Sequence, residues 1–223
     1  MTNATTSTTT TLQPTDPRFH FAQAVVTARA TIEAVRPEQM ELPTPCPDYD
    51  VRALLGHMGI VFMRVAALGN GEDPMALPDH VEGVADDAWG AHFLEAAHAV
   101  QAAWTDDAKL AQPMVLPWAT APGAAMLGMY TSELTVHTWD LAVATGQQPA
   151  WHGPTLEAAL ATALVALPSG DREAHFAAMA VDMPQIAGRP PFRNPVDAGA
   201  TASTLNQLVG WYGRQPVGPA SAA

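Results

Sequence analysis

The strongest constraint on the fold is a repeat of apolar residues every three to four positions in four long stretches of the chain. Residues 50–69 show this repeat, which places Val51, Leu54, Leu55, Met58 and Val61 on one side of a predicted helix. The same period runs through residues 16–36, 88–105 and 121–145, and the alternation typical of strands is absent. We therefore predict an all-α protein built on a four-helix bundle.

Local signals predict how the second of these helices begins and what surrounds the bundle. Prolines in residues 42–50 force an extended approach, after which Asp50 can cap the helix and Tyr49 can pack on Leu54. Gly146 is expected to end the fourth helix. Further short helices are predicted at 154–167, 173–181 and 201–211, an extended segment at 113–118, and loops at 69–87 and 188–195. Residues 1–15 and 215–223 are expected to be disordered tails, which leaves residues 16–214 as one domain.

The charge of the chain limits its partners. The formal net charge is −12, and Lys109 is the single lysine. Nucleic acids and anionic membrane surfaces require clustered cations, so both are excluded as expected partners. Charges, glycines and prolines interrupt every apolar run before about 18 residues, which argues against a membrane-spanning helix. A small-molecule substrate is the expected partner, and a homodimer is compatible with the sequence.

Cys46 is the single cysteine. A single cysteine excludes an intramolecular disulfide and fits a reducing compartment. The N-terminal residues also lack the features of a signal peptide, so we predict a cytoplasmic protein. Cys46 could be a nucleophile or a thiolate ligand, but no positive neighbour that would lower its pKa is visible in the sequence. A small buried residue in a Pro-rich turn is the favoured interpretation.

Glu133 and His137 are the strongest candidates for metal ligands. They lie four residues apart in a predicted helix and so share one face. A third ligand can come from a neighbouring helix, and His57 is the expected donor because it lies within the apolar stripe of residues 50–69. Two histidines and one glutamate form the ligand set of catalytic zinc, and also of sites that hold non-haem iron. Zinc is the expected metal, with iron or nickel as alternatives.

Three further side chains are predicted to lie near this metal. Tyr130 and Arg64 are each seven residues from a ligand and therefore close to it in azimuth. Tyr130 could donate a proton or simply pack in the bundle, and Arg64 could receive a substrate carboxylate or form a surface salt bridge. We take both as candidate catalytic residues that line an entrance to the metal, and we expect the loops 69–87 and 184–197 to form the walls of that entrance. Asp140 follows His137 by three residues and could orient it.

Four stretches of the sequence carry a resemblance to a known family. They are TPCPDYDVR at 44–52 leading into LLGH at 54–57, LPW at 116–118 with PG at 122–123, ELTVHTWDLA at 133–142, and NPV at 194–196 followed by GWYGR at 210–214. With these motifs the chain resembles the mycothiol-dependent maleylpyruvate isomerase N-terminal family of the DinB-like superfamily, and within it a short single-domain branch. The resemblance implies a DinB-like bundle with a metal held by His57, Glu133 and His137. Maleylpyruvate isomerases carry a further α/β domain, whereas the residues after Gly146 are predicted to form helices and loops.

Three functions are compatible with these observations. The first is a metalloenzyme that uses a low-molecular-weight thiol such as mycothiol. Such an enzyme would either transfer the thiol to a small electrophile or use the thiol to isomerise that electrophile. The second is another metal-dependent reaction, such as a hydrolysis or a biosynthetic cyclisation. The third is a non-catalytic bundle that binds a metal or a small molecule, for which four protein ligands around the metal would be evidence.

Overall fold

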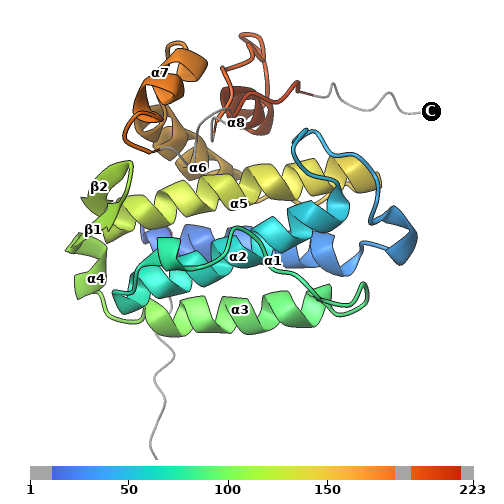
Figure 1. Cartoon of the computed structure of the whole chain (residues 1–223), viewed down its shortest axis with the longest axis horizontal. Helices are drawn as coiled ribbons and strands as arrows, with labels where there is room; N and C mark the ends of the chain where they lie inside the picture. Colours follow the sequence, from blue (N-terminus) through green and yellow to red (C-terminus); the bar gives the residue numbers. More distant parts are fainter. Residues whose placement is uncertain (1–11, 184–191, 217–223) are drawn as a thin grey trace, which may run out of the picture.

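Four long helices form the centre of the computed structural model, which describes residues 12–183 and 192–216. They are α1 (Pro17–Glu33), α2 (Val51–Asn70), α3 (Trp89–Ala103) and α5 (Gly123–Thr145). Helices α1 and α2 each pack against both α3 and α5, so the four helices enclose one core (Figure 1). The predicted all-α bundle is confirmed, and each long helix begins and ends within three residues of its predicted bounds.

Aromatic rings and a close helix contact hold the bundle core. Phe62 lies between Phe21 and Phe93, with ring centroids 5.9 Å and 5.4 Å apart. The indole nitrogen of Trp104 donates to the carbonyl oxygen of Val65 at 2.9 Å. A Cβ atom at Gly69 would lie 2.6 Å from that nitrogen, so the end of α2 needs glycine where Trp104 crosses it.

The predicted approach to α2 is present. Pro43 and Asp50 form an antiparallel bridge, and the hydroxyl of Thr44 donates to the carbonyl oxygen of Tyr49 at 2.8 Å. Asp50 caps α2, because its side chain accepts from the amide of Ala53 at 2.8 Å. At the same end of the bundle, where Gln39 donates to the carbonyl oxygen of Thr145 at 3.1 Å, Gly146 has a φ of 71° and ends α5 as predicted.

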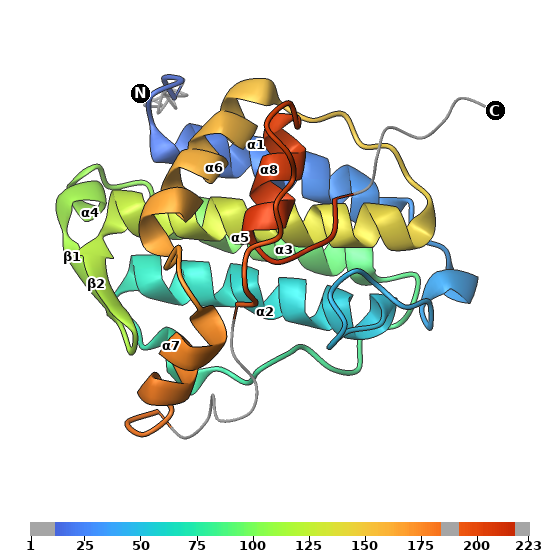
Figure 2. The ribbon, with the colours of Figure 1, turned by 90° about the horizontal axis from the view of Figure 1, so that it is seen from above.

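The chain after α5 builds a second layer. Helices α6 (Gly153–Ala166), α7 (Arg172–Met179) and α8 (Thr204–Trp211) confirm the three predicted short helices. Figure 2 shows α6 and α8 lying across the outer side of α5. There they bury a second apolar cluster that includes Trp139 of α5. Its other buried members are Val136, Ala159, Ala163, Leu167, Leu208, Val209 and Tyr212.

The connection between α3 and α5 differs from the prediction. After the short helix α4 (Ala108–Ala111), which was not predicted, β1 (Pro113–Leu116) and β2 (Ala119–Pro122) form an antiparallel hairpin. Residues 121 and 122 therefore belong to a strand, although they were predicted to open the helix. The apolar period of a helix is too coarse to detect a four-residue strand, and only the first strand carried the signal of flanking prolines.

By length and composition alone, helix α2 could cross a membrane. The interruption of the apolar runs by charges, glycines and prolines argued against such a helix. Most of α2 is buried between the other bundle helices, as in a core helix. The predicted tails, 1–15 and 215–223, and the predicted loop 188–195 lie partly outside the described residues.

Candidate metal centre and substrate pocket

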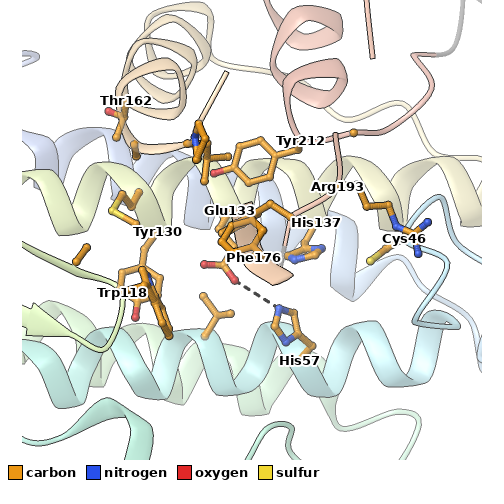
Figure 3. A pocket seen from close by; sticks show the side chains of 18 of the residues that line it. Cys46, His57, Trp118, Tyr130, Glu133, His137, Thr162, Phe176, Arg193 and Tyr212 are labelled. Carbon is orange, nitrogen blue, oxygen red and sulfur yellow. Dashed lines mark ion pairs between the residues drawn. The ribbon is translucent and has the colours of Figure 1, made fainter. Parts of the chain in front are cut away.

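His57 of α2 and Glu133 and His137 of α5 meet where the two helices pack together (Figure 3). One ligand atom from each of the three side chains lies within 4.8 Å of the other two, and Nε2 of His57 is 3.5 Å from Oε1 of Glu133. Ligand atoms of one tetrahedral zinc ion lie roughly 3–3.5 Å apart, because each is about 2.0–2.2 Å from the metal. This set of two nitrogens and one carboxylate oxygen therefore fits a divalent cation after small side-chain rotations. The predicted residues are brought together, and their role as ligands stays a prediction.

The protonation of these groups suits a cation. Burial lowers the pKa of His137, so its imidazole is neutral, as a metal ligand must be. Burial disfavours the charge on Glu133, but the hydrogen bond from His57 and the positive charge of Arg64 hold the pKa of this carboxyl below its ordinary value. Glu133 is therefore ionised.

Each histidine is oriented by a neighbour through its other ring nitrogen. Nδ1 of His137 lies 3.1 Å from Oδ2 of Asp140, which is the predicted contact. Nδ1 of His57 lies 3.4 Å from the hydroxyl of Tyr49, whose ring stacks on the imidazole at 5.0 Å. Burial raises the pKa of Tyr49 to about 12, so its phenol stays protonated. Nε2 of His57 faces Glu133, and the contact with Asp140 occupies only Nδ1 of His137, so in both histidines the second ring nitrogen is available to a metal.

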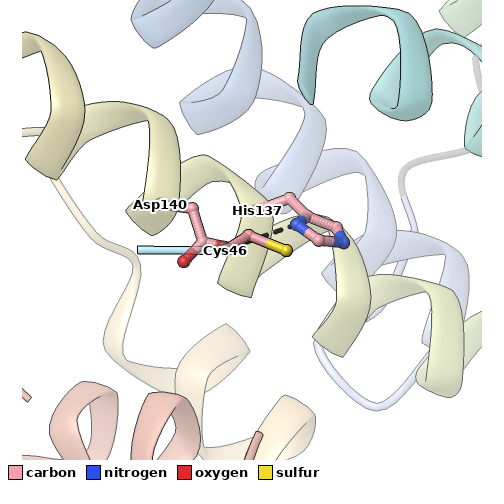
Figure 4. Close-up of side chains that lie close together, drawn as sticks. All are labelled: Cys46, His137 and Asp140. Carbon is pink, nitrogen blue, oxygen red and sulfur yellow. Dashed lines mark hydrogen bonds and ion pairs between the residues drawn. The ribbon is translucent and has the colours of Figure 1, made fainter. Parts of the chain in front are cut away.

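Cys46 lies next to this centre and forms a second cluster with His137 and Asp140 (Figure 4). Burial raises the pKa of its thiol, although Arg214 lies close enough to oppose that shift. The expectation that Cys46 has no positive neighbour was therefore wrong, because Arg214 approaches from the far end of the chain. Asp140 is already held by Arg214 through two hydrogen bonds of 3.2 Å and 2.9 Å, which leaves this second cluster poorly suited to a cation.

A cavity of about 830 Å³ opens in front of the three candidate ligands. This volume is typical of pockets that hold small molecules. Its walls were predicted to be the loops 69–87 and 184–197, yet of the first loop only Met75 lines the cavity, and residues 184–191 of the second lie outside the described residues. Phe192 and Arg193 of the second loop do line the cavity, and the hairpin, α6 and α7 add side chains that include Trp118, Ala161, Thr162, Val165, His175, Phe176 and Met179.

Arg64 and Tyr130 both line this cavity, as their spacing predicted. Nη2 of Arg64 donates to the carbonyl oxygen of Pro78 at 3.1 Å and pairs with the exposed Asp79 at 3.3 Å. Its buried Nε has no hydrogen-bond partner among the described residues, so the guanidinium can still bind an anion. Tyr130 is buried, and burial raises the pKa of its hydroxyl.

Sequence reasoning missed several pocket residues. Tyr49 was assigned to packing on Leu54, whereas its ring stacks on His57. Arg193 was expected only as part of the predicted wall loop 184–197, and Tyr212 and Arg214 were part of no site prediction, although GWYGR at 210–214 was a marked motif. That motif was the one signal that could have drawn attention to them.

Comparison with known proteins places this geometry in a family. A solved structure described as the mycothiol-dependent maleylpyruvate isomerase superposes with a TM-score of 0.53 and 17% identity, over 68% of this chain and 68% of that one, which supports the bundle fold. Uncharacterized proteins of two strains of Mycobacterium tuberculosis are 29% identical over 134 residues, which are 59% of this chain and 69% of theirs. The profile of the mycothiol maleylpyruvate isomerase N-terminal domain matches residues 21–142, more than half of the chain and all three candidate ligands. The chain belongs to the mycothiol maleylpyruvate isomerase N-terminal domain family.

Proposed function

We propose that the protein is a metal-dependent enzyme that joins a low-molecular-weight thiol to a small electrophile, either to transfer the thiol or to isomerise the electrophile. His57, Glu133 and His137 would hold one divalent cation, and zinc suits this ligand set best. The membership of the family makes mycothiol the first thiol to test. The observation that carries the proposal is the convergence of these three side chains at one end of an open cavity of about 830 Å³.

The donor set suits a catalytic rather than a closed site. Three protein ligands converge, and the cavity gives access to the positions that remain. A divalent cation held there would supply Lewis acidity and so would lower the pKa of a thiol bound to it.

The other residues of the cavity would bind and orient the electrophile. Arg64 has donor capacity left over for a carboxylate. The hydroxyl of Tyr130 keeps its proton because burial raises its pKa, so it can donate a hydrogen bond or a proton to an oxygen of the substrate. The apolar side chains of α6 and α7 exclude water from the opposite side.

The test is a screen of purified, zinc-loaded protein for thiol-dependent conversion of small electrophiles, with mycothiol and other thiols supplied in turn. We expect turnover that requires both the thiol and the metal, and that is lost in His137→Ala. His98→Ala is the matched control, because His98 is exposed on α3 and outside the cavity. Metal-dependent hydrolysis without any thiol would favour the second candidate reaction, and zinc held by four protein ligands would contradict a catalytic role.

A further inference from the structure

Asp140 is a fully buried carboxylate with two partners, one on each side. Its Oδ2 lies 3.1 Å from Nδ1 of His137, one turn earlier on α5. Arg214 donates to Oδ1 through Nε at 3.2 Å and to Oδ2 through Nη2 at 2.9 Å. The guanidinium thus grips both oxygens at once, in the paired geometry that fixes a carboxylate most firmly. Figure 4 shows how Asp140 and His137 face each other beside Cys46.

Arg214 is itself held in place by the turn that follows α8. Its amide donates to the carbonyl oxygen of Val209 at 3.0 Å, and its Nη1 donates to the carbonyl oxygen of Tyr212 at 3.0 Å. Gly213 makes this turn with a φ of 79°, and a Cβ atom there would lie 2.7 Å from Cβ of Arg193. Arg214 is only 8% exposed and Asp140 is fully buried, so the ion pair between them is shielded from water.

We propose that Arg214 is a positioning residue for the metal centre, which acts through Asp140 to fix the ring of His137. The pair keeps the carboxylate of Asp140 directed at Nδ1 of His137, which leaves Nε2 of that ring as the nitrogen that would bind the metal. The proposal rests on the proposed metal site and adds to it a residue that lies outside residues 21–142, the part of the chain matched by the family profile. The second layer of the fold would then contribute to metal affinity as well as to the pocket wall.

The alternative is that Arg214 only fastens the end of the chain to α5. Ser132 provides the comparison, because its hydroxyl lies 2.8 Å from the hydroxyl of Tyr212 and so ties the same two segments together without contacting Asp140. Ser132→Ala should loosen the attachment and lower Tm. It should leave the orientation of His137 unchanged.

The experiment compares wild type, Arg214→Met, Arg214→Lys and Ser132→Ala. For each, the dissociation constants of Zn²⁺ and Co²⁺ are measured by competition with a chelator, together with the visible spectrum of the Co²⁺ form and the Tm of the metal-free form. Loss of a residue that orients a ligand weakens metal binding about 10- to 100-fold. We expect a loss of that size and a changed Co²⁺ spectrum in Arg214→Met, a smaller loss in Arg214→Lys, and wild-type affinity in Ser132→Ala.

Arg214→Met with wild-type affinity and an unchanged Co²⁺ spectrum would overturn the proposal, and so would an equal loss in Ser132→Ala. If Arg214→Met does not fold, Arg214→Lys decides, since weaker binding than in Ser132→Ala supports the proposal and wild-type binding contradicts it. Failure of wild type to bind either metal is a different result, because it would remove the metal site itself and this inference with it.

Discussion

Glu133 is the one acidic member of the candidate ligand set, and its pKa is held low by His57 and the positive charge of Arg64 against the effect of burial. We predict that Glu133→Gln weakens Zn²⁺ binding by at least about 100-fold, more than the loss of a residue that only orients a ligand. The size of the side chain barely changes, so the helical circular dichroism spectrum should match that of wild type. Chelator competition measures the affinity, and unchanged affinity would remove Glu133 from the site.

Metal content gives a second prediction for these residues. Because three ligand atoms converge in one place, elemental analysis should find about one divalent metal per chain in wild type. His57→Ala and His137→Ala should both lose it, whereas His98→Ala should keep it. Full occupancy in both ligand variants would show that the metal is bound elsewhere.

Arg64 allows the role of charge in the cavity to be separated from the metal. Removing a charged hydrogen-bond donor costs about 1.5–3 kcal/mol, so Arg64→Ala should weaken binding of carboxylate ligands roughly 10- to 100-fold. Neutral analogues of the same ligands should bind as they do to wild type, and metal content should not change. Equal weakening for charged and neutral ligands would indicate a role in packing instead of anion binding.

Among the elements, the start of α1 offers a test of pH dependence away from the metal. Asp16 caps the helix at the amide of Arg18 and pairs with the Arg18 guanidinium, which also bonds Asp107 beyond α3. The hydrogen bond with the Arg18 side chain lowers the pKa of Asp16 from its ordinary value of 3.8. A group whose pKa is lowered by folding stabilises the fold above its unfolded pKa and stops doing so as the pH falls.

We therefore predict that Asp16→Asn, which keeps the cap but loses the ion pair, is about 1–2 kcal/mol less stable than wild type near pH 7. The difference in the free energy of unfolding should shrink as the pH falls below 3.8 and the folded protein's Asp16 takes up a proton. Denaturant titrations of both proteins across this pH range measure it. A difference that is independent of pH would show that the ion pair contributes nothing.

The elements that sequence analysis predicted well are those whose signal is local. The apolar period fixed the four long helices, and the spacing of Glu133 and His137 placed both on one face of α5. The hairpin was half missed, since each strand has only four residues and the second carries no alternation of large apolar side chains. Arg214 could not be placed, because it meets Asp140 across 74 residues of sequence and no periodic pattern reports such a contact.

For the whole molecule, the joining of α2 and α5 by one ion predicts that metal stabilises the fold. A ligand at about 100 times its dissociation constant adds about 2.7 kcal/mol, which for a chain of this size raises Tm by roughly 5–10 °C. Thermal melts with and without Zn²⁺ should show this rise in wild type and none in His57→Ala. Equal melting of wild type with and without the metal would contradict a bridge between the two helices.

The candidate ligands and one side of the pocket wall come from different parts of the chain. The three ligands lie within residues 21–142, whereas α6, α7 and residues 192–193 line the opposite side of the cavity. Changes confined to α6, α7 and residues 192–193 would therefore alter the substrate pocket while leaving the three candidate ligands, Asp140 and Arg214 in place. Relatives that share the ligand-bearing helices and Arg214 but differ in α6 and α7 should prefer the same metal and convert different substrates, so a substrate assigned to one of them is a poor guide to the substrate of another.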